Sequence, residues 1–395
     1  MRPPLKSTPA YTRDRESSGI TLNMIVKNEA GTMPRLIESV RDVIDYYVIS
    51  DTGSTDETPE LITKLMAERG IPGEVHFEPW VNFGHNRQRA LDAAIAAGRS
   101  GWLLFIDADE ELASTDREWF RKLVRGTTYR LQKHHNSLRY ALNNLVWLDG
   151  NTWSWHGPVH EYVQAHKPAP AETLENAWII YHAGEGARSR GVTTQEKFLR
   201  DAAILEDDLV RNPNNPRNVF YLAQSYRDAG ELPKAYSRYV QRAEMGQWPE
   251  EVFVARLEAA RLGTALKIPF EEISRHCLKG FEACPHRAET LWHLAALLRE
   301  QRRFAEGYIY AKTAKDIPYP TNSLFVRRDV YTWQILDEFS ICAYWIGSYD
   351  EAAAAGRQIL DEGRFPESHR TRLEANLKFA LDKINARSAH SPLQG

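Results

Sequence analysis

The chain has 395 residues, a length typical of two or three domains rather than of one small core. Hydrophobic residues make up 43% and charged residues 26%, ordinary globular values that exclude a disordered or fibrous protein. Lys and Arg number 50 against 53 Asp and Glu. The formal net charge of −3 therefore argues against attachment to nucleic acid by bulk phosphate attraction, although a local basic groove stays open.

The cysteines and the chain ends favour a cytoplasmic protein. The three cysteines, Cys277, Cys284 and Cys342, have spacings that support neither a disulfide framework nor a C-x-x-C zinc cluster. No apolar run approaches the roughly 18 residues that span a bilayer, and residues 1–18 lack the apolar core of a secretory signal. We expect residues 1–18 and 388–395 to be flexible tails.

Short apolar runs alternate with helical patterns from Ile20 to about Tyr181, which predicts an α/β domain with a Rossmann-like sheet. Strands are expected at 20–26, 46–50, 74–77 and 102–106, and helices at 34–43, 58–69 and 87–97. The run at 102–106 is apolar on both faces and predicts a buried central strand. Because ligands bind at the carboxyl ends of the strands in such sheets, the segments after these strands are expected to share one crevice.

From about Val192 the sequence changes to helices rich in Ala, Leu, Tyr and Arg. Alanines recur at intervals of 36 residues, close to the roughly 34-residue period of tetratricopeptide helix pairs, at Ala223, Ala259 and Ala295. A fourth pair is expected over 340–356, out of phase because residues 316–331 have the character of an insertion. We expect an all-α, tetratricopeptide-like repeat domain over 193–387. An irregular helical domain is the alternative, since residues 252–265 match the repeat poorly.

Carboxylates follow directly on the predicted central strand, at Asp107, Asp109, Glu110 and Glu111. Two residues apart at an exposed strand end, Asp107 and Asp109 can share a hard divalent ion with the oxygens of a diphosphate. A D-x-D pair alone is a weak signal, because surface acidic runs are commonly just solvated. The apolar strand that feeds into this pair favours a metal site.

Three further motifs accompany the acidic cluster. Val26-Lys27-Asn28-Glu29 ends the first strand, residues 51–56 (D-T-G-S-T-D) end the second, and residues 83–91 (F-G-H-N-R-Q-R-A-L) open a helix. Together with I-D-A-D-E at 106–110, the series resembles the family 2 glycosyltransferases of GT-A fold over roughly residues 20–182. Four motifs in the same order are far more specific than any one of them. The resemblance implies a GT-A glycosyltransferase domain over residues 19–192.

The resemblance also implies a nucleotide-sugar site at Asn28, Glu29, Asp51, Asn86, Arg87, Asp107, Trp155 and Arg188. Asp51 is expected to accept hydrogen bonds from a uracil-like base. The alternative, compatible with this role, is that residues 51–56 cap the following helix. Asn86 and Arg87 near a helix start can meet a base or a phosphate, with a plain exposed basic face as the alternative.

A second cluster, residues 153–161 (W-S-W-H-G-P-V-H-E), is similar to a W-x-G-x-x-H-E stretch found in a subset of these transferases. Inverting transfer needs a carboxylate to take the proton of the acceptor hydroxyl, so Glu161 is the candidate catalytic base. A structural carboxylate in a Gly-Pro turn is the alternative. His160 is expected to orient Glu161 or to contact phosphate, or else to be a core histidine. The neighbouring tryptophans either stack on sugar or cover the domain core, at Trp147, Trp153 and Trp155.

His182 precedes a Gly-rich segment over residues 183–190. Many GT-A enzymes supply a late histidine as a metal ligand. The resemblance therefore implies that Asp107, Asp109 and His182 bind Mn²⁺ or Mg²⁺. The segment with Arg188 predicts a mobile flap over the diphosphate, with an ordinary interdomain loop as the alternative.

These features predict a metal-dependent, inverting glycosyltransferase that uses a nucleotide diphosphate sugar, with a UDP-sugar favoured. The Q-x-x-R-W motif of processive synthases and a membrane segment are both missing, so polymer extrusion is not expected. The helical repeats are the natural place to recognise an acceptor, for which a peptide or protein is favoured, and to form a homodimer.

Several alternatives stay open. The acceptor can instead be a lipopolysaccharide core, another glycan or a modified base, although nucleic acid is disfavoured by the charge balance. Two other classes of protein are a nucleotidyltransferase, whose G-x-G-T-R loop is absent from the sequence, and a non-catalytic repeat scaffold.

Overall fold

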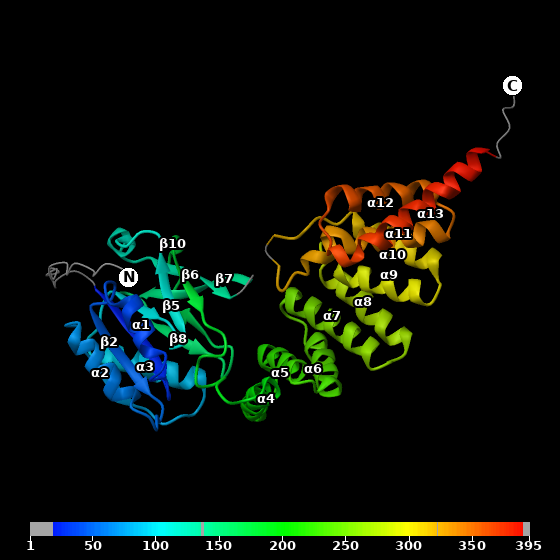
Figure 1. Cartoon of the computed structure of the whole chain (residues 1–395). Helices are drawn as coiled ribbons and strands as arrows, with labels where there is room; N and C mark the ends of the chain where they lie inside the picture. The colour runs from blue at the N-terminus through cyan, green and yellow to red at the C-terminus, as the bar shows by residue number, and fades with distance from the viewer. Residues whose placement is uncertain (1–18, 136–137, 322, 390–395) are drawn as a thin grey trace. The chain divides into compact units, whose positions relative to one another are not determined.

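The structure is a computed structural model that describes residues 19–135, 138–321 and 323–389. The chain divides into two compact units between Ile204 and Leu205, inside a helix, rather than at the expected boundary of 192/193. Each unit is described by itself (Figure 1). The expected tails at 1–18 and 390–395 lie outside the described residues, whereas the last helix continues to Ala389, beyond the expected start of the C-terminal tail at Ser388.

The first unit is built on a mixed sheet whose order, in the described residues, is β3-β2-β1-β4-β7-β6-β10-β5. The bounds are β1 (Ile20–Val26), β2 (Tyr46–Asp51), β3 (Gly73–Phe77), β4 (Trp102–Phe105), β5 (Glu110–Ser114), β6 (Thr128–His135), β7 (Leu138–Trp147) and β10 (Ala171–Tyr181). The pairs β1·β2, β2·β3, β1·β4 and β6·β10 are parallel, whereas β4·β7, β6·β7 and β5·β10 are antiparallel. A separate antiparallel ribbon joins β8 (Trp153–His156) and β9 (Tyr162–Ala165).

Layers cover both faces of the parallel part of this sheet. Because side chains alternate along a strand, neighbouring strand residues enter different cores. Helices α1 (Met33–Val40) and α2 (Thr58–Glu68) pack in the core that holds Leu104 of β4, together with Leu36, Ile37, Ile62 and Met66. Helix α3 (Phe83–Ala96) and the β8–β9 ribbon pack in the core that holds Leu103, together with Leu91, Ala94, Trp153 and Val163. A short turn of 3-10 helix, η1 (Trp119–Lys122), also lies in this unit.

The predicted Rossmann-like α/β fold is confirmed, and the strands expected at 20–26, 46–50 and 102–106 correspond to β1, β2 and β4. Helix α3 begins at Phe83, four residues before the expected helix at 87–97. The reason is the side chain of Asn82, which accepts a 2.8 Å hydrogen bond from the His85 backbone and caps the helix there.

The second unit is helical, and its elements in the described residues are α4 (Thr194–Arg211, which crosses the division), α5 (Pro216–Asp228), α6 (Leu232–Glu244), α7 (Pro249–Ala265), α8 (Phe270–Ala283), α9 (Glu289–Glu300), α10 (Phe304–Lys315), η2 (Val330–Gln334), α11 (Ile335–Trp345), α12 (Tyr349–Glu362), η3 (Glu367–His369) and α13 (Arg370–Ala389). From α5 onward each α-helix packs on the next, and α7, α9, α11 and α13 also pack on one another in series. Stacked helix pairs of this kind confirm the tetratricopeptide-like class. Within the part of the chain that the structure describes, no helix is both long and apolar enough to cross a membrane.

Candidate functional site

A pocket of about 680 Å³ lies at the carboxyl ends of the parallel strands in the first unit. Its walls come from the segments after β1 and β4, from α3, from Glu161 and from the first turns of α4. The Gly-rich segment contributes residues 186–189. The sheet therefore brings segments far apart in the sequence to one crevice, as parallel strands with a common carboxyl edge do.

Arg87 joins two carboxylates on the pocket wall. Its Nε donates to Oε1 of Glu161 over 2.7 Å, and its Nη2 donates to Oδ1 of Asp107 over 2.5 Å. The guanidinium is buried and lies 5.1 Å from the ring centroid of Trp155, close enough for a cation–π contact. Trp155 in turn packs edge-on against Phe105 at the end of β4. The planar guanidinium thereby fixes the position of Glu161 relative to the strand end that carries Asp107.

Lys133, on β6, supplies a second buried cation to the same acidic group. Its Nζ lies 2.6 Å from Oε1 of Glu110 and 3.9 Å from Oδ2 of Asp107. Burial alone opposes ionisation of Asp107, but the charges of Arg87 and Lys133 outweigh it and lower the pKa of Asp107 to about 2. Asp107 is therefore a carboxylate already neutralised by the protein.

Asp109 is different, because no ion pair among the described residues includes it. Burial, reinforced by the charges of Asp107, Glu110 and Glu29, raises the pKa of Asp109 to about 7. Its side chain lines the pocket beside Gly186, where a Cβ would lie 2.5 Å from Oδ2. A half-buried carboxylate that has no cation among the described residues and faces a pocket is suited to an oxygen-binding divalent ion such as Mg²⁺ or Mn²⁺.

The Gly-rich segment over residues 183–190 is held by contacts on two sides of the pocket, to the segment after β1 and to α4. Oε1 of Glu29 accepts a 2.8 Å hydrogen bond from the backbone of Ala187, and Arg190 donates to the carbonyl of Asn28. On the other side, Arg188 pairs with the buried Asp201 of α4. Burial raises the pKa of Glu29, and the charge of ionised Glu29 is one of the causes that raise the pKa of Asp109. The segment thus contacts its surroundings through charged side chains and a backbone amide.

The start of α3 and the turn that carries Glu161 approach each other through their backbones. A Cβ at Gly84 would lie 2.1 Å from the carbonyl oxygen of Gly157, so only glycine fits there. The amide of Phe83 also donates to the carbonyl of Pro158 over 3.1 Å. These backbone contacts hold the loop that carries Glu161 against the start of α3, one helical turn before Arg87. Arg87 can therefore bond to Glu161.

Part of the first unit matches a known protein family. Residues 21–126 match the family described as "Glycosyl transferase family 2". Residues 21–126 form a family 2 glycosyltransferase domain. The match includes the segments after β1, β2 and β4 and the whole of α3, which supply much of the pocket.

Relatives among curated proteins are similar to parts of the chain. The SPbeta prophage-derived glycosyltransferase SunS of Bacillus subtilis (strain 168) is 23% identical over 231 residues, which cover 56% of this chain and 52% of SunS. An uncharacterized glycosyltransferase of Rickettsia felis is 34% identical over 94 residues, 24% of this chain and 30% of that protein. A TPR repeat-containing protein of Synechococcus elongatus is 39% identical over 93 residues, 24% of this chain and 21% of that protein. The chain thus spans between about a fifth and about half of the length of these relatives.

Among solved structures, YrrB, a TPR protein with an unusual peptide-binding site, aligns with a TM-score of 0.36 and 14% identity. The alignment covers 49% of this chain and 95% of that one. The MamA protein aligns with a TM-score of 0.35 and 12% identity over 45% of this chain and 87% of that one.

Seven of the predicted site residues line the pocket of the glycosyltransferase domain: Asn28, Glu29, Arg87, Asp107, Asp109, Glu161 and Arg188. Five others do not: Asp51, Asn86, Trp155, His160 and His182. Two of the pocket residues also hold the backbone. Glu29 binds the Gly-rich segment, and Asn28, with a φ of 56°, accepts a 2.7 Å hydrogen bond from the backbone of Thr55 and joins the ends of β1 and β2.

Asp51 and Asn86 serve their own loops. The carboxylate of Asp51 accepts hydrogen bonds from the backbone amides of Gly53 and Ser54, at 3.2 and 3.1 Å, and from the Ser54 hydroxyl. These bonds lie within the turn, whereas the first amide of the following helix, that of Thr58, donates to Asp56 over 3.1 Å, as the helix-capping alternative expects. The amide of Asn86 is fully buried, donates to the carbonyl of Pro79 and accepts from the backbone of Val81, both at 2.9 Å. Both ends of the Asn86 side chain are therefore engaged away from the pocket.

The tryptophans and histidines also separate. Trp147 and Trp153 are buried, as the core alternative predicts, and Trp155 supports Arg87. His160 is exposed with a φ of 55°. His182 lies with Nε2 3.0 Å from Oε2 of Glu111. Among the described residues, Asp107, Asp109 and His182 do not form a group of three ligand atoms within 4.8 Å.

Three cations of the glycosyltransferase pocket region were not predicted from the sequence. Lys133 lies in the middle of a strand, where no motif marks it. Lys197 and Arg200 line the pocket from α4, beyond the expected domain boundary at 192/193. Lys197, Arg200 and Ile204 are three and four residues apart, which places them on one face of α4. With the first domain extended past residue 192, this spacing would have indicated a face of α4 directed at the pocket.

Proposed function

We propose that this chain is an inverting, metal-dependent glycosyltransferase that moves a sugar from a nucleotide diphosphate sugar, with a UDP-sugar favoured, to an acceptor nucleophile. The observation that carries the proposal is the position of Glu161, held by Arg87 on the wall of a pocket that also contains the unpaired carboxylate of Asp109. The family 2 match of residues 21–126 supports the reaction class.

Glu161 is the proposed catalytic base. Among the described residues, Arg87 donates a hydrogen bond to Oε1 of Glu161. Oε2 is therefore the oxygen that we expect to accept the proton. As the acceptor oxygen attacks the anomeric carbon, the bond from that carbon to the diphosphate oxygen breaks and the acceptor proton passes to Glu161. Arg87 acts as a positioning residue, because it keeps Glu161 oriented toward the pocket while also holding Asp107.

Asp109 is the proposed ligand of a divalent cation. Such an ion supplies Lewis-acid stabilisation of the negative charge on the leaving diphosphate. Lys197, Arg200 and Arg188 on the other walls of the pocket provide fixed positive charge for the phosphate oxygens. His182 remains a predicted metal ligand. Its Nε2 lies 3.0 Å from Oε2 of Glu111, whereas its backbone amide donates to the carbonyl of Asp109 over 3.0 Å.

The proposed acceptor is a peptide or protein recognised by the helical unit. Stacked helix pairs form extended surfaces that bind extended chains, and the helical unit has this architecture from α5 to α13. Mass spectrometry of the acceptor fraction, after incubation with the preferred donor, distinguishes a peptide acceptor from the alternatives. These are a lipopolysaccharide core, another glycan or a modified base.

The experiment that tests the reaction is hydrolysis of a panel of nucleotide sugars with and without Mn²⁺. We expect turnover of one donor class that requires the metal, and Glu161→Gln should keep donor binding while sugar transfer is lost. Glu172→Gln, at an exposed position on β10, is the matched control and should behave as the wild type. Absence of turnover with every donor would favour a scaffold, and pyrophosphate release from a nucleoside triphosphate would favour a nucleotidyltransferase.

A further inference from the structure

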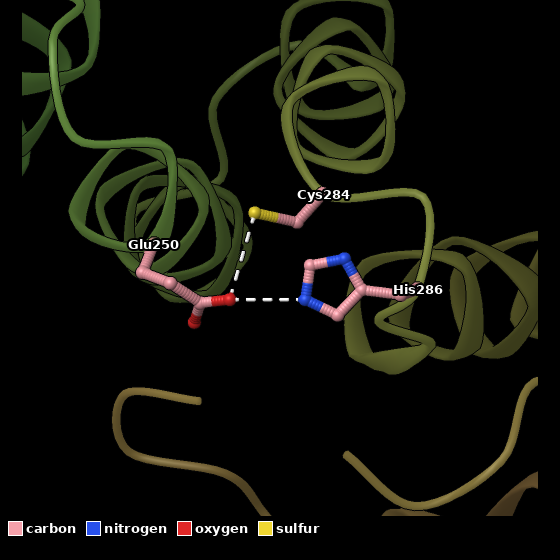
Figure 2. Close-up of side chains that lie close together, drawn as sticks. All are labelled: Glu250, Cys284 and His286. Atoms are coloured by element: carbon pink, nitrogen blue, oxygen red, sulfur yellow. Dashed lines mark hydrogen bonds and ion pairs between the residues drawn. The ribbon is translucent and has the colours of Figure 1, made fainter. Parts of the chain in front are cut away.

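Three side chains of different chemistry converge in the helical unit, far along the chain from the glycosyltransferase domain. Glu250 lies in the first turn of α7, Cys284 follows α8, and His286 lies two residues later in the turn before α9. Their ligand atoms all lie within 4.8 Å of one another, and they form the one such group of three found in the described residues. Figure 2 shows both Cys284 and His286 directed at the same carboxylate oxygen.

The distances suit a small ion with four ligands. Oε1 of Glu250 lies 3.0 Å from Nε2 of His286 and 3.9 Å from Sγ of Cys284. Ligand atoms about 2.0 to 2.3 Å from a tetrahedral zinc ion lie roughly 3.3 to 3.8 Å apart, so small side-chain adjustments are enough. A combination of thiolate, imidazole and carboxylate is a donor set for zinc rather than for the oxygen-binding ions Mg²⁺ or Ca²⁺.

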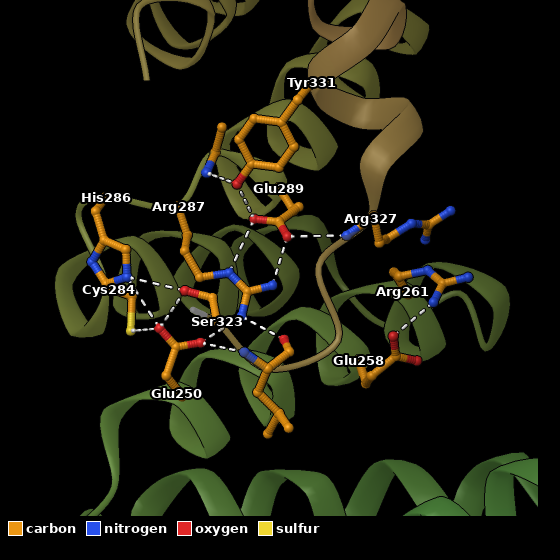
Figure 3. Close-up of polar contacts among 12 residues, drawn as sticks. Glu250, Glu258, Arg261, Cys284, His286, Arg287, Glu289, Ser323, Arg327 and Tyr331 are labelled. Carbon is orange, nitrogen blue, oxygen red and sulfur yellow. Dashed lines mark hydrogen bonds and ion pairs between the residues drawn. The ribbon is translucent and has the colours of Figure 1, made fainter. Parts of the chain in front are cut away.

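The second oxygen of Glu250 is held by other groups. Oε2 accepts hydrogen bonds from Nη1 of Arg287 at 2.8 Å and from the backbone of Leu324 at 3.0 Å, while Oε1 faces the other two side chains (Figure 3). Arg287 is itself neutralised by Glu289, with Nη2 2.6 Å from Oε1. Partners of this kind orient a ligating carboxylate and leave its other oxygen for the metal.

The surroundings leave room for a fourth ligand. A cavity of about 390 Å³ is lined by Glu250, His286, residues 318–321 and Ser323, the last five from the segment between α10 and η2. Within it, the Ser323 hydroxyl lies 3.0 Å from Oε1 of Glu250. The thiol of Cys284 is buried, whereas the side chain of His286 is 58% exposed, so an ion can enter from the histidine side.

We propose that Glu250, Cys284 and His286 form a Zn²⁺ site in the helical unit, with the fourth coordination position open to this cavity. The site is independent of the proposed transferase reaction, because its residues belong to the second unit. Bound zinc would tie α7 to the turn between α8 and α9 and add to the hydrogen bonds that already anchor Ser323 and Leu324.

The test uses the full chain, stripped of metal with a chelator and titrated with Zn²⁺ against a chromophoric competitor. We expect one zinc per chain in the wild type, and a loss of binding of at least about tenfold in Cys284→Ser and in His286→Ala. His286 is exposed, so His286→Ala should retain its helical circular dichroism even if Cys284→Ser unfolds. Co²⁺ in place of Zn²⁺ should give thiolate-to-metal charge-transfer absorption that Cys284→Ser abolishes.

Two control variants separate this site from others. Cys277→Ala removes a buried thiol on α8 outside the cluster, and Asp109→Asn removes the proposed metal ligand of the first unit. Both should keep the zinc stoichiometry. A wild-type chain that binds no zinc, or equal binding in the wild type, Cys284→Ser and His286→Ala, would overturn the proposal and leave the cluster as a set of hydrogen bonds.

Discussion

Arg87 donates from Nε to Oε1 of Glu161 over 2.7 Å, although the two residues are 74 positions apart in the sequence. Arg87 belongs to a rigid helix, and Glu161 to the turn before β9. The ion pair therefore fixes the carboxylate of Glu161 relative to α3, in addition to the position that its own turn gives it.

We predict that Arg87→Lys lowers kcat by about a hundredfold, because one ammonium group cannot hold Glu161 and Asp107 as the planar guanidinium does, and small misplacements of catalytic groups have effects of this size. KM for the donor should change less. Steady-state kinetics check this, with Arg89→Lys, an exposed neighbour on the same helix, as the control. An unchanged kcat in Arg87→Lys would remove the positioning role.

We expect Asp109→Asn to stabilise the metal-free protein while abolishing metal-dependent binding of UDP. The substitution removes a half-buried carboxylate that has no cation among the described residues, so the metal-free protein should gain about 1 kcal/mol in free energy of unfolding. The same variant should lose metal-dependent binding of UDP. Denaturant unfolding and calorimetric titration measure the two effects. The control Asp116→Asn, at an exposed pair with Lys122, should change neither the unfolding free energy nor the binding of UDP. Normal Mn²⁺-dependent binding of UDP by Asp109→Asn would rule out Asp109 as the metal ligand.

Lys197 is expected to bind the diphosphate of the donor. Burial, and then the neighbouring charge of Arg188, lower the pKa of Lys197, so an anion in the pocket would relieve both effects. Since a hydrogen bond to a charged group contributes about 1.5 to 3 kcal/mol, Lys197→Ala should weaken donor binding by about tenfold or more. Fluorescence or calorimetric binding of UDP measures the loss. Lys64→Ala, at an exposed position on α2, should bind as the wild type, and equal affinities in all three proteins would contradict the assignment.

The helical unit should lose stability as the pH falls from about 6.5 to about 4. Burial, followed by the charge of Arg256, lowers the pKa of His276 to about 4. Nη1 of Arg256 donates to Nδ1 of His276 over 3.1 Å, so Nδ1 cannot take a proton without losing this bond. The unfolded chain binds a proton below about 6.5 and the folded chain does not, so each pH unit removes up to about 1.4 kcal/mol of unfolding free energy.

His276→Gln should reduce this pH dependence, because glutamine stays neutral. Urea unfolding of the full chain at pH 7, 6 and 5, monitored by helical circular dichroism, gives the slopes. His369→Gln, at a half-buried position beside Trp333, should keep the wild-type slope. Identical slopes in the wild type and His276→Gln would show that other groups cause the acid sensitivity.

Much of the fold followed from local patterns. The apolar run at 102–106 predicts the buried strand β4, and two of the four acidic residues after it, Asp107 and Asp109, line the pocket. The contacts of Arg87 with Glu161 and of Lys133 with Glu110 could not be predicted, because they join segments whose proximity depends on the sheet order β4-β7-β6 and on the β8–β9 ribbon. The prediction that Asn86 meets the ligand rests on its place near a helix start in the family motif, yet adjacent residues on a helix point in different directions and Asn86 bonds to Pro79 instead.

The close approach of Gly84 to the carbonyl of Gly157 has a consequence for engineering the donor preference. A spacing set by two backbones cannot be retuned by choosing a larger or smaller side chain, so the frame that holds Arg87 and Glu161 tolerates little variation. The Gly-rich segment and α4 contact the same pocket through side chains such as Arg188 and Lys197, which can be exchanged. Libraries that seek a new donor should therefore randomise these two segments and leave residues 83–87 and 157–161 intact.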